Sequence, residues 1–418
     1  MIKNLYMEKI GKNARIASSD LSNLSIKKRN AVLKQFCKYL KIYSKLIIKE
    51  NKKDILKVIK VKSSMINRLE LNKEKIIQII KGIETIIKLK DPLDKIISSW
   101  KRPNGLIIKK ISIPIGIIGV IYESRPNVTS DVSALCFKSG NTVILRGGSE
   151  AFYSNKILSN LFRGALKKEN CNENCVQFIT KQDRHNVDYL LSNMGQYIDI
   201  IIPRGGKSLV HKVQKKSRVP TIGHLEGICH VYIDKDADLK MAVKIVVNAK
   251  MRNYSICGAA ETLLIDKACL RTHCDPILKE LTKQKCEIRG DSFIKNNFSN
   301  KIKMATKKDW STEYLSPTIS VKSVDGVVGA INHINKYGTF HTDSIVTKNK
   351  KTSEEFISKI NSAIAIHNAS TQFADGGEFG FGAEVGISTQ KLTPRGPVGL
   401  DQLTTYKYLL QGKGQIRK

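Results

Sequence analysis

Cys257 is the residue of this chain best suited to covalent chemistry, because it stands in the segment Ile256–Thr262, just ahead of an apolar run that is typical of a strand. A thiolate is a strong nucleophile toward an activated acyl group. A cysteine is also a small apolar side chain that is often simply buried. Spacing alone leaves both interpretations open.

Glycine-rich turns follow three predicted strands: Arg146–Glu150, which contains Ser149, Pro203–Ser208, which contains Gly205 and Gly206, and Gly376–Gly380. Such a turn at the start of a helix presents backbone N–H groups to an anion, but it also serves as a tight connection without a ligand. The second turn is not a P-loop, because the glycine that this motif requires earlier falls on Ile201. Cofactor contact and simple geometry remain alternatives for all three turns.

Three polar residues fit either a functional site or a purely structural role. Asn127 precedes a predicted helix, where it would serve as an N-cap. His224 and His230 flank Leu225–Gly227 near the predicted boundary between two α/β series, and each also fits a hydrogen-bonded core position.

The cysteines and histidines predict no metal site and no disulfide framework. Cys269, His273 and Cys274 match no standard zinc spacing and lack an evident fourth ligand, and the same holds for Cys171 and Cys175. The nine cysteines are an odd number without paired spacing, which favours a reducing compartment.

The elements that must position these residues form two α/β series. The first has predicted strands over 116–122, 142–145, 176–179 and 198–202, and helices over 128–138, 151–168 and 187–194. The second begins near Ile228, with strands over 230–233, 262–265, 318–321 and 363–366. This alternation predicts a doubly wound parallel sheet with helices on both faces, the usual frame for a dinucleotide.

Apolar residues at three-to-four spacing predict helices ahead of the first series, over 25–59 and after Asn72. Residues 94–114 predict a hairpin with its turn at Arg102–Gly105.

The charge balance, 71 Lys and Arg against 37 Asp and Glu in 418 residues, gives a net charge of +34. The basic residues are mostly lysines scattered through every segment, so we do not interpret them as a nucleic-acid site. The N-terminal residues resemble no signal peptide, and the most apolar run, 111–122, is too short to span a bilayer. We therefore expect a cytoplasmic protein without membrane contact.

Several segments together resemble one family, the glutamate-5-semialdehyde dehydrogenases or γ-glutamyl phosphate reductases. They are Pro114–Thr129, Lys138–Ala151, Ile202–Gly206, Gly223–Tyr232, Val247–Lys250, Asn368–Thr371, Asp375–Gly380, Gly382–Glu384 and Ser388–Lys391. The resemblance runs over nearly the whole chain.

The resemblance implies an α/β fold of the aldehyde dehydrogenase superfamily. Residues 1–93 and 115–227 would form the dinucleotide-binding domain, 228–390 the catalytic domain, and 94–114 and 391–418 the oligomerisation elements. The hairpin would pair with the strand region 404–416 of a neighbouring subunit, so a homo-oligomer is expected.

The reaction that the resemblance implies is NADPH-dependent reduction of L-glutamyl 5-phosphate to glutamate 5-semialdehyde, the second step of proline synthesis from glutamate. Glutamate 5-kinase, which makes the labile acyl phosphate, would be a possible partner. By resemblance, Cys257 is the nucleophile, and the Asn127 side chain with the Cys257 backbone N–H stabilises the oxyanion.

The same resemblance assigns the binding residues. Glu313 would hold the nicotinamide ribose, and Arg146 and Ser149 would lie at the adenosine end. Gly205 and Gly206 would let the backbone approach the pyrophosphate or nicotinamide. The substrate's carboxylate and phosphate would be met by Arg125, Arg204 and His224.

Two departures from the family pattern concern the nucleophile segment: Gly258 stands where the family has Asn, and 252–255 lacks the usual proline. A hydrolytic aldehyde dehydrogenase is an alternative in the same superfamily, with Glu226 near the position of its base. We assign Glu226 no role, because a phosphate-exchanging enzyme needs no activated water. A basic nucleic-acid-binding protein without catalysis is the alternative from another class.

Overall fold

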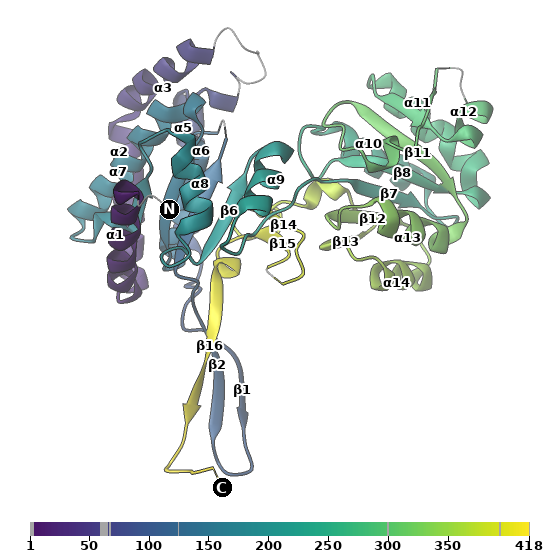
Figure 1. Ribbon diagram of the computed structural model, residues 1–418. Coiled ribbons are helices and arrows are strands. Elements are labelled where there is room, and N and C mark those ends of the chain that lie inside the picture. The colour runs from purple at the N-terminus through teal and green to yellow at the C-terminus, as the bar shows by residue number, and fades with distance from the viewer. Residues whose placement is uncertain are drawn as a thin grey trace. The chain divides into compact units, whose positions relative to one another are not determined.

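Two compact units divide the chain in this computed structural model (Figure 1), which describes residues 4–58, 66, 68–123, 125–298, 301–392 and 394–417. The first unit comprises Met1–Gly223, Gly380–Gly386 and Val398–Lys418, and the second comprises His224–Phe379 and Ile387–Pro397. The division from sequence placed this boundary between 227 and 228 and gave 391–418 to the oligomerisation elements.

A parallel four-stranded sheet forms the centre of the first unit, in the order β5-β4-β3-β6. Its strands are β3 (Ile117–Tyr122), β4 (Thr142–Gly147), β5 (Val176–Phe178) and β6 (Ile200–Arg204). Side chains of β3 alternate between two cores, with Ile118 and Val120 in one and Ile117 and Ile121 in the other. Both faces of the sheet are therefore covered, and the predicted doubly wound architecture is confirmed.

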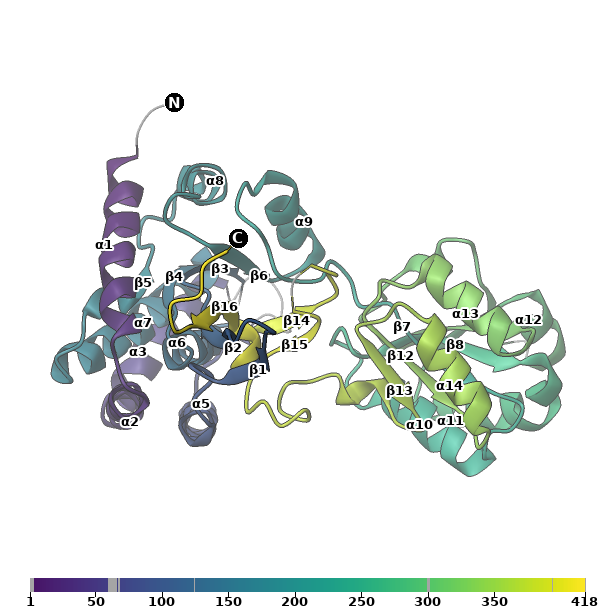
Figure 2. The same cartoon turned by 90° about the horizontal axis from the view of Figure 1, so that it is seen from below.

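The helices of the first unit lie on both faces of that sheet (Figure 2). One face carries α2 (Ile26–Ile42), α3 (Ser44–Val58), α5 (Lys73–Lys88), α6 (Asn127–Lys138) and α7 (Phe152–Lys168). The other carries α1 (Leu5–Ser22), α8 (Arg184–Asn193) and α9 (Lys207–Lys216).

The single helix predicted over 25–59 is two helices. α2 ends at Ile42, where the backbone of Tyr43 leaves the helical region at φ −94° and ψ 17°, and α3 begins at Ser44. The apolar spacing continues across this break, which is why the periodicity did not reveal it. Ile59, the predicted end, lies outside the described residues.

A three-stranded antiparallel sheet of the first unit contains β1 (Ile96–Lys101), β2 (Ile107–Pro114) and β16 (Thr404–Gln411). The predicted hairpin is confirmed: the Gly105 N–H donates to the Arg102 carbonyl, and the φ of +87° at Gly105 suits glycine. The predicted pairing of the C-terminal strand with a neighbouring subunit is wrong. β16 pairs along its length with β2 of its own chain, because β1 leaves that edge of β2 open.

The second unit contains a seven-stranded sheet in the order β10-β9-β11-β8-β7-β12-β13, with every pair parallel. Its strands are β7 (Cys229–Ile233), β8 (Ala260–Asp266), β9 (Glu287–Gly290), β10 (Lys303–Met304), β11 (Thr318–Val324), β12 (Thr342–Val346) and β13 (Ile364–His367). Two short strands, β14 (Gly386–Ser388) and β15 (Gly396–Val398), pair with each other.

Helices of the second unit cover both faces of its sheet. α10 (Leu239–Met251), α11 (Asp275–Lys283) and α12 (Ser292–Phe298) contribute to one core, and α13 (Gly326–Tyr337) and α14 (Lys350–Lys359) to the other. Among the described residues, no helix is both long and apolar enough to cross a membrane.

Candidate active site

Cys257 lies at the corner of a tight turn between α10 and β8. The Ala259 N–H donates to the Ile256 carbonyl at 3.0 Å, which places Cys257 and Gly258 at the two central positions. The thiol is partly exposed. A Cβ at Gly258 would lie 3.2 Å from the Thr371 carbonyl oxygen, so the missing side chain lets this loop pass close to that backbone.

The backbone of Cys257 is held by two residues at the start of β7, Gly227 just before the strand and Cys229 as its first residue. A Cβ at Gly227 would come 2.1 Å from the Cys257 carbonyl oxygen, so no larger residue fits there without a shift. The Cys229 thiol donates to the same oxygen at 3.1 Å. Burial raises the pKa of Cys229 well above its usual value, so this thiol remains a donor. The turn that carries Cys257 is therefore fixed in position.

Two imidazoles converge on the Cys257 thiol. The Sγ atom and one ring nitrogen each of His224 and His341 all lie within 4.8 Å of one another. The two rings meet edge to face, with centroids 4.9 Å apart. His224 was predicted from sequence as a substrate ligand, whereas His341 was missed, because it precedes β12, far from Cys257 in the chain.

His230, by contrast, is a core residue. Its ring is fully buried, and Nδ1 lies 2.7 Å from a carboxylate oxygen of Asp343. The core interpretation is therefore confirmed for His230 and does not apply to His224, whose partly exposed ring faces the thiol.

Glu313 binds the loop that packs against the Cys257 turn, because the Gly227 N–H donates to Glu313 Oε1 at 2.8 Å. Close to it in sequence, the Leu315 N–H donates to Glu261 at 3.3 Å. Glu261 forms a fully buried ion pair with Lys250 at 2.5 Å, and burial raises the pKa of Glu261. Sequence reasoning missed this pair, although Lys250 belongs to one of the family segments.

The site residues predicted in the first unit lie where its parallel strands end. Asn127 opens α6 after β3, and Arg204 ends β6. Arg146 is the second-last residue of β4, and Ser149 follows that strand. Since β3 and β6 are neighbours in the sheet, Asn127 and Arg204 lie at its topological switch point, where ligands of such sheets bind.

Asn127 is the first residue of α6, and the N-cap position is Pro126, which provides no side-chain cap. The Asn127 Nδ2 atom donates to Asp131 at 3.0 Å. The helix-cap interpretation is therefore wrong. Burial raises the pKa of Asp131 to about 6, and the charge of Arg204 opposes this shift.

Gly205 and Gly206 meet the carboxylate of Glu123. The Gly206 N–H donates to Glu123 Oε2 at 2.9 Å, and a Cβ at Gly205 would come 2.6 Å from the same oxygen. α9 starts directly after Gly206, so an anion already lies at its positive end.

Arg146 and Ser149 lie beside the start of α7. The Arg146 guanidinium donates to the carbonyls of Gly147 and Gln182, and burial lowers its pKa. Ser149 begins a short 3-10 turn that runs into α7.

Arg125 and Arg204 are two of the cations at this end of the first unit. Arg125 is exposed, and the Arg204 Nη1 atom lies 4.0 Å from Glu384. The structure thus gathers Asn127, Arg125 and Arg204 in the first unit, and Cys257, His224 and Glu313 in the second.

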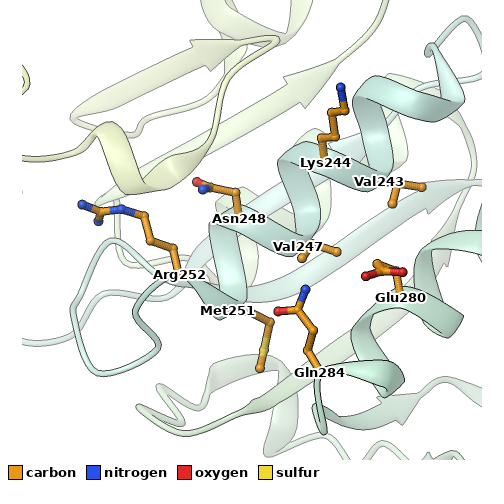
Figure 3. A pocket seen from close by; sticks show the side chains of 8 residues that line it. All are labelled: Val243, Lys244, Val247, Asn248, Met251, Arg252, Glu280 and Gln284. Atoms are coloured by element: carbon orange, nitrogen blue, oxygen red, sulfur yellow. The ribbon is translucent and has the colours of Figure 1, made fainter.

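A surface cavity of about 450 Å³ lies between α10 and α11 (Figure 3). Its lining includes Val247, Met251, Arg252 and Glu280. None of the predicted site residues lines it, so it does not mark the site.

Sequence comparison assigns the family. The profile of the aldehyde dehydrogenase family matches residues 3–296. The γ-glutamyl phosphate reductase of Parvibaculum lavamentivorans is 47% identical over 416 residues, which cover 99% of this chain and 98% of that protein. This chain belongs to the aldehyde dehydrogenase family and, within it, to the γ-glutamyl phosphate reductases. The resemblance seen in the sequence is confirmed.

Solved structures agree with this family. The γ-glutamyl phosphate reductase of Thermotoga maritima is 42% identical and superimposes with a TM-score of 0.96, covering 99% of this chain and all 100% of that one. An acetylating aldehyde dehydrogenase of Geobacillus thermoglucosidasius is 16% identical, with a TM-score of 0.70 and coverage of 99% and 98%, and so shares the fold.

Proposed function

We propose that this protein reduces L-glutamyl 5-phosphate to L-glutamate 5-semialdehyde and phosphate in the cytoplasm, as the second step of proline biosynthesis. The observation that carries the proposal is the placement of Cys257, whose thiol is partly exposed on a turn with a fixed backbone. Family membership over the whole chain supports the substrate. All nine cysteines are free thiols, which suits a reducing compartment.

In the proposed reaction, the Cys257 thiolate attacks the acyl carbon, and the bond to phosphate breaks to leave a thioacyl enzyme. NADPH would supply, when bound, the hydride that reduces this thioester. The resulting thiohemiacetal releases the aldehyde when its oxygen loses a proton and the bond to Sγ breaks, which returns the thiolate. Asn127 and the Cys257 backbone N–H stabilise the oxyanion of both acyl steps.

The residues at the switch point of the first unit fit a dinucleotide. The close approach of Gly205 to Glu123 leaves no room for a Cβ before α9. Arg146 would favour a 2′-phosphate, which is the basis for proposing NADP(H), with Ser149 at the adenosine end. Gly205 and Gly206 would face the pyrophosphate side after Glu123 turns away, and Glu313 would hold the nicotinamide ribose.

The substrate's carboxylate and phosphate need cations, and we propose Arg125, Arg204 and His224 for them. A homo-oligomer is proposed because the outer edges of β1 and β16 are unpaired in the described part of this chain. Glutamate 5-kinase is proposed as a partner because an acyl phosphate is labile.

The reverse reaction tests this function. Glutamate 5-semialdehyde and NADP are supplied with and without phosphate, and formation of NADPH is followed by absorbance. Formation that requires phosphate supports the proposal. Formation without phosphate would identify a hydrolytic dehydrogenase, and no formation by folded protein would overturn the substrate assignment.

We expect Cys257→Ala to abolish turnover while leaving NADPH binding within about twofold, because it removes only the nucleophile. Cys274→Ala is a matched control, since Cys274 is fully buried in the core of the second unit. Activity retained in Cys257→Ala would refute the role of this thiol.

A further inference from the structure

We propose that Cys257, His224 and His341 form a binding site for a divalent metal ion of the zinc class, and that an ion bound there reversibly blocks the enzyme. The sequence predicted no metal site, because these three residues are separated in the chain and match no ligand spacing. The inhibition, though not the binding, rests on the proposed function of Cys257.

The donor set is the one that zinc prefers. One thiolate and two imidazoles match the soft and borderline ligands of Zn²⁺, whereas Mg²⁺ and Ca²⁺ require oxygen ligands. Three protein ligands leave a fourth position for water. The thiol gives its proton to solvent on binding, and no oxidation state changes.

The distances are close to those of a tetrahedral site. The three donor atoms lie within 4.8 Å of one another. Zinc bonds of 2.0–2.3 Å imply donor atoms about 3.3–3.6 Å apart, so closure requires a movement of about 1 Å. Cys257 is partly exposed at the corner of its turn, so we assign this movement to its side chain.

Both histidines are oriented by a bond from Nδ1. His224 Nδ1 lies 2.7 Å from the Ile387 carbonyl oxygen, which only accepts, so Nδ1 carries the proton and Nε2 keeps its lone pair. Such an outer hydrogen bond is typical of a histidine that binds a metal.

His341 gives the stronger indication of a metal-binding site. Its Nδ1 lies 2.9 Å from Thr342 Oγ1 and 3.5 Å from the Cys229 sulfur. Cys229 donates its S–H to the Cys257 carbonyl, which leaves its sulfur able to accept from His341, and the proposed site takes the tautomer with the proton on Nδ1. His341 Nε2 is fully buried and has no hydrogen-bond partner among the described residues. A buried nitrogen lone pair without a partner is costly, and a metal ion would satisfy it.

Zinc titration of the full-length protein tests the site without substrate or cofactor. The chelator-treated protein competes with a chromophoric zinc indicator, and we expect one Zn²⁺ per chain. Cys257→Ala, His224→Gln and His341→Gln should each weaken binding more than about tenfold, since even loss of an outer-sphere partner costs 10–100-fold. Affinity unchanged in Cys257→Ala would overturn the proposal.

His273→Gln is the matched control. His273 lies in the same unit beside Cys269 and Cys274, and its Nε2 contacts the Ala237 carbonyl at 3.2 Å. We expect it to leave zinc affinity unchanged. An equal loss in His273→Gln would mean that zinc binds elsewhere or adventitiously, and would overturn the proposal.

Alkylation of wild-type Cys257 by iodoacetamide needs no variant that might fail to fold. Zn²⁺ should slow alkylation at this residue, as read by peptide mass spectrometry, and a chelator should restore the rate. An unchanged rate would overturn the proposal. If the protein binds zinc but lacks the phosphate-dependent reaction, the metal site is supported and the proposed function is refuted. If it catalyses the phosphate-dependent reaction but does not bind zinc, the proposed function is supported and the metal site is refuted.

Discussion

Cys257 is suited to covalent catalysis because its backbone is held by Gly227 and Cys229 while its thiol lies at the corner of a turn. Each residue makes one contact: Gly227 permits the close approach of the two loops, the Cys229 thiol donates to the Cys257 carbonyl, and the turn exposes the Cys257 thiol. The oxyanion partner proposed in the first unit, Asn127, is held in a similar way by Asp131.

Asn127→Ala should lower kcat by about 10²–10³-fold, because it removes a donor to the developing oxyanion. Steady-state kinetics measures this, and the urea midpoint of the variant controls for a loss of stability. A kcat close to that of the wild type would mean that the amide serves only its bond to Asp131.

Asp131 should make stability depend on pH. Its folded pKa is raised from 3.8 to about 6, so the folded protein binds this proton more tightly than the unfolded chain. Its contribution to stability is therefore full below about pH 4 and is lost as the pH rises through about 6. From about pH 4 to about pH 6, the free energy of unfolding of the wild type should fall by about 1–3 kcal/mol more than that of Asp131→Asn. Urea unfolding of both proteins measures the difference, and a constant difference would contradict the shift.

At the scale of elements, the loop before β7 positions the loop before β8. Gly227→Ala places a Cβ 2.1 Å from the Cys257 carbonyl oxygen, so one loop must move. We expect a loss of about 1–3 kcal/mol in stability together with a fall in kcat.

Gly82→Ala is the matched control for Gly227→Ala. Gly82 lies within α5, and a Cβ there would meet nothing within 4 Å. This change should stabilise the protein by up to about 1 kcal/mol without changing kcat. A Gly227→Ala variant with the kcat of the wild type would show that the two loops are not coupled.

At the scale of the whole molecule, the β1-β2-β16 sheet is the surface best suited to self-association. It exposes apolar side chains on both outer strands, including Ile97 on β1 and Leu410 on β16. The double change of Ile97 and Leu410 to Lys should dissociate the proposed homo-oligomer, because it places charge on both open edges.

Sedimentation velocity measures the change in assembly. Leu392→Lys is the control, since Leu392 is 100% exposed in the second unit, outside this sheet. An unchanged sedimentation coefficient in the double variant would place the subunit contact elsewhere.

The sequence by itself determined the features that depend on neighbours in the chain. The hairpin turn at Arg102–Gly105, the parallel α/β class and the family segments were all predicted correctly. Asn127 follows β3 as predicted, whereas Arg146 and Arg204, which were predicted in the turns after strands, lie in the last residues of β4 and β6. All three lie at the same edge of the sheet, because the carboxyl ends of parallel strands meet there.

Only the tertiary structure decided the features that depend on strand order. β12 lies beside β7, although β8 to β11 separate them in the chain. This order brings His341 close to Cys257 at the amino ends of the strands. The spacing of the two residues in the chain did not predict this contact. The partner of β16 was mispredicted for the same reason, because hydrogen bonds between distant strands leave no periodic signal in the sequence.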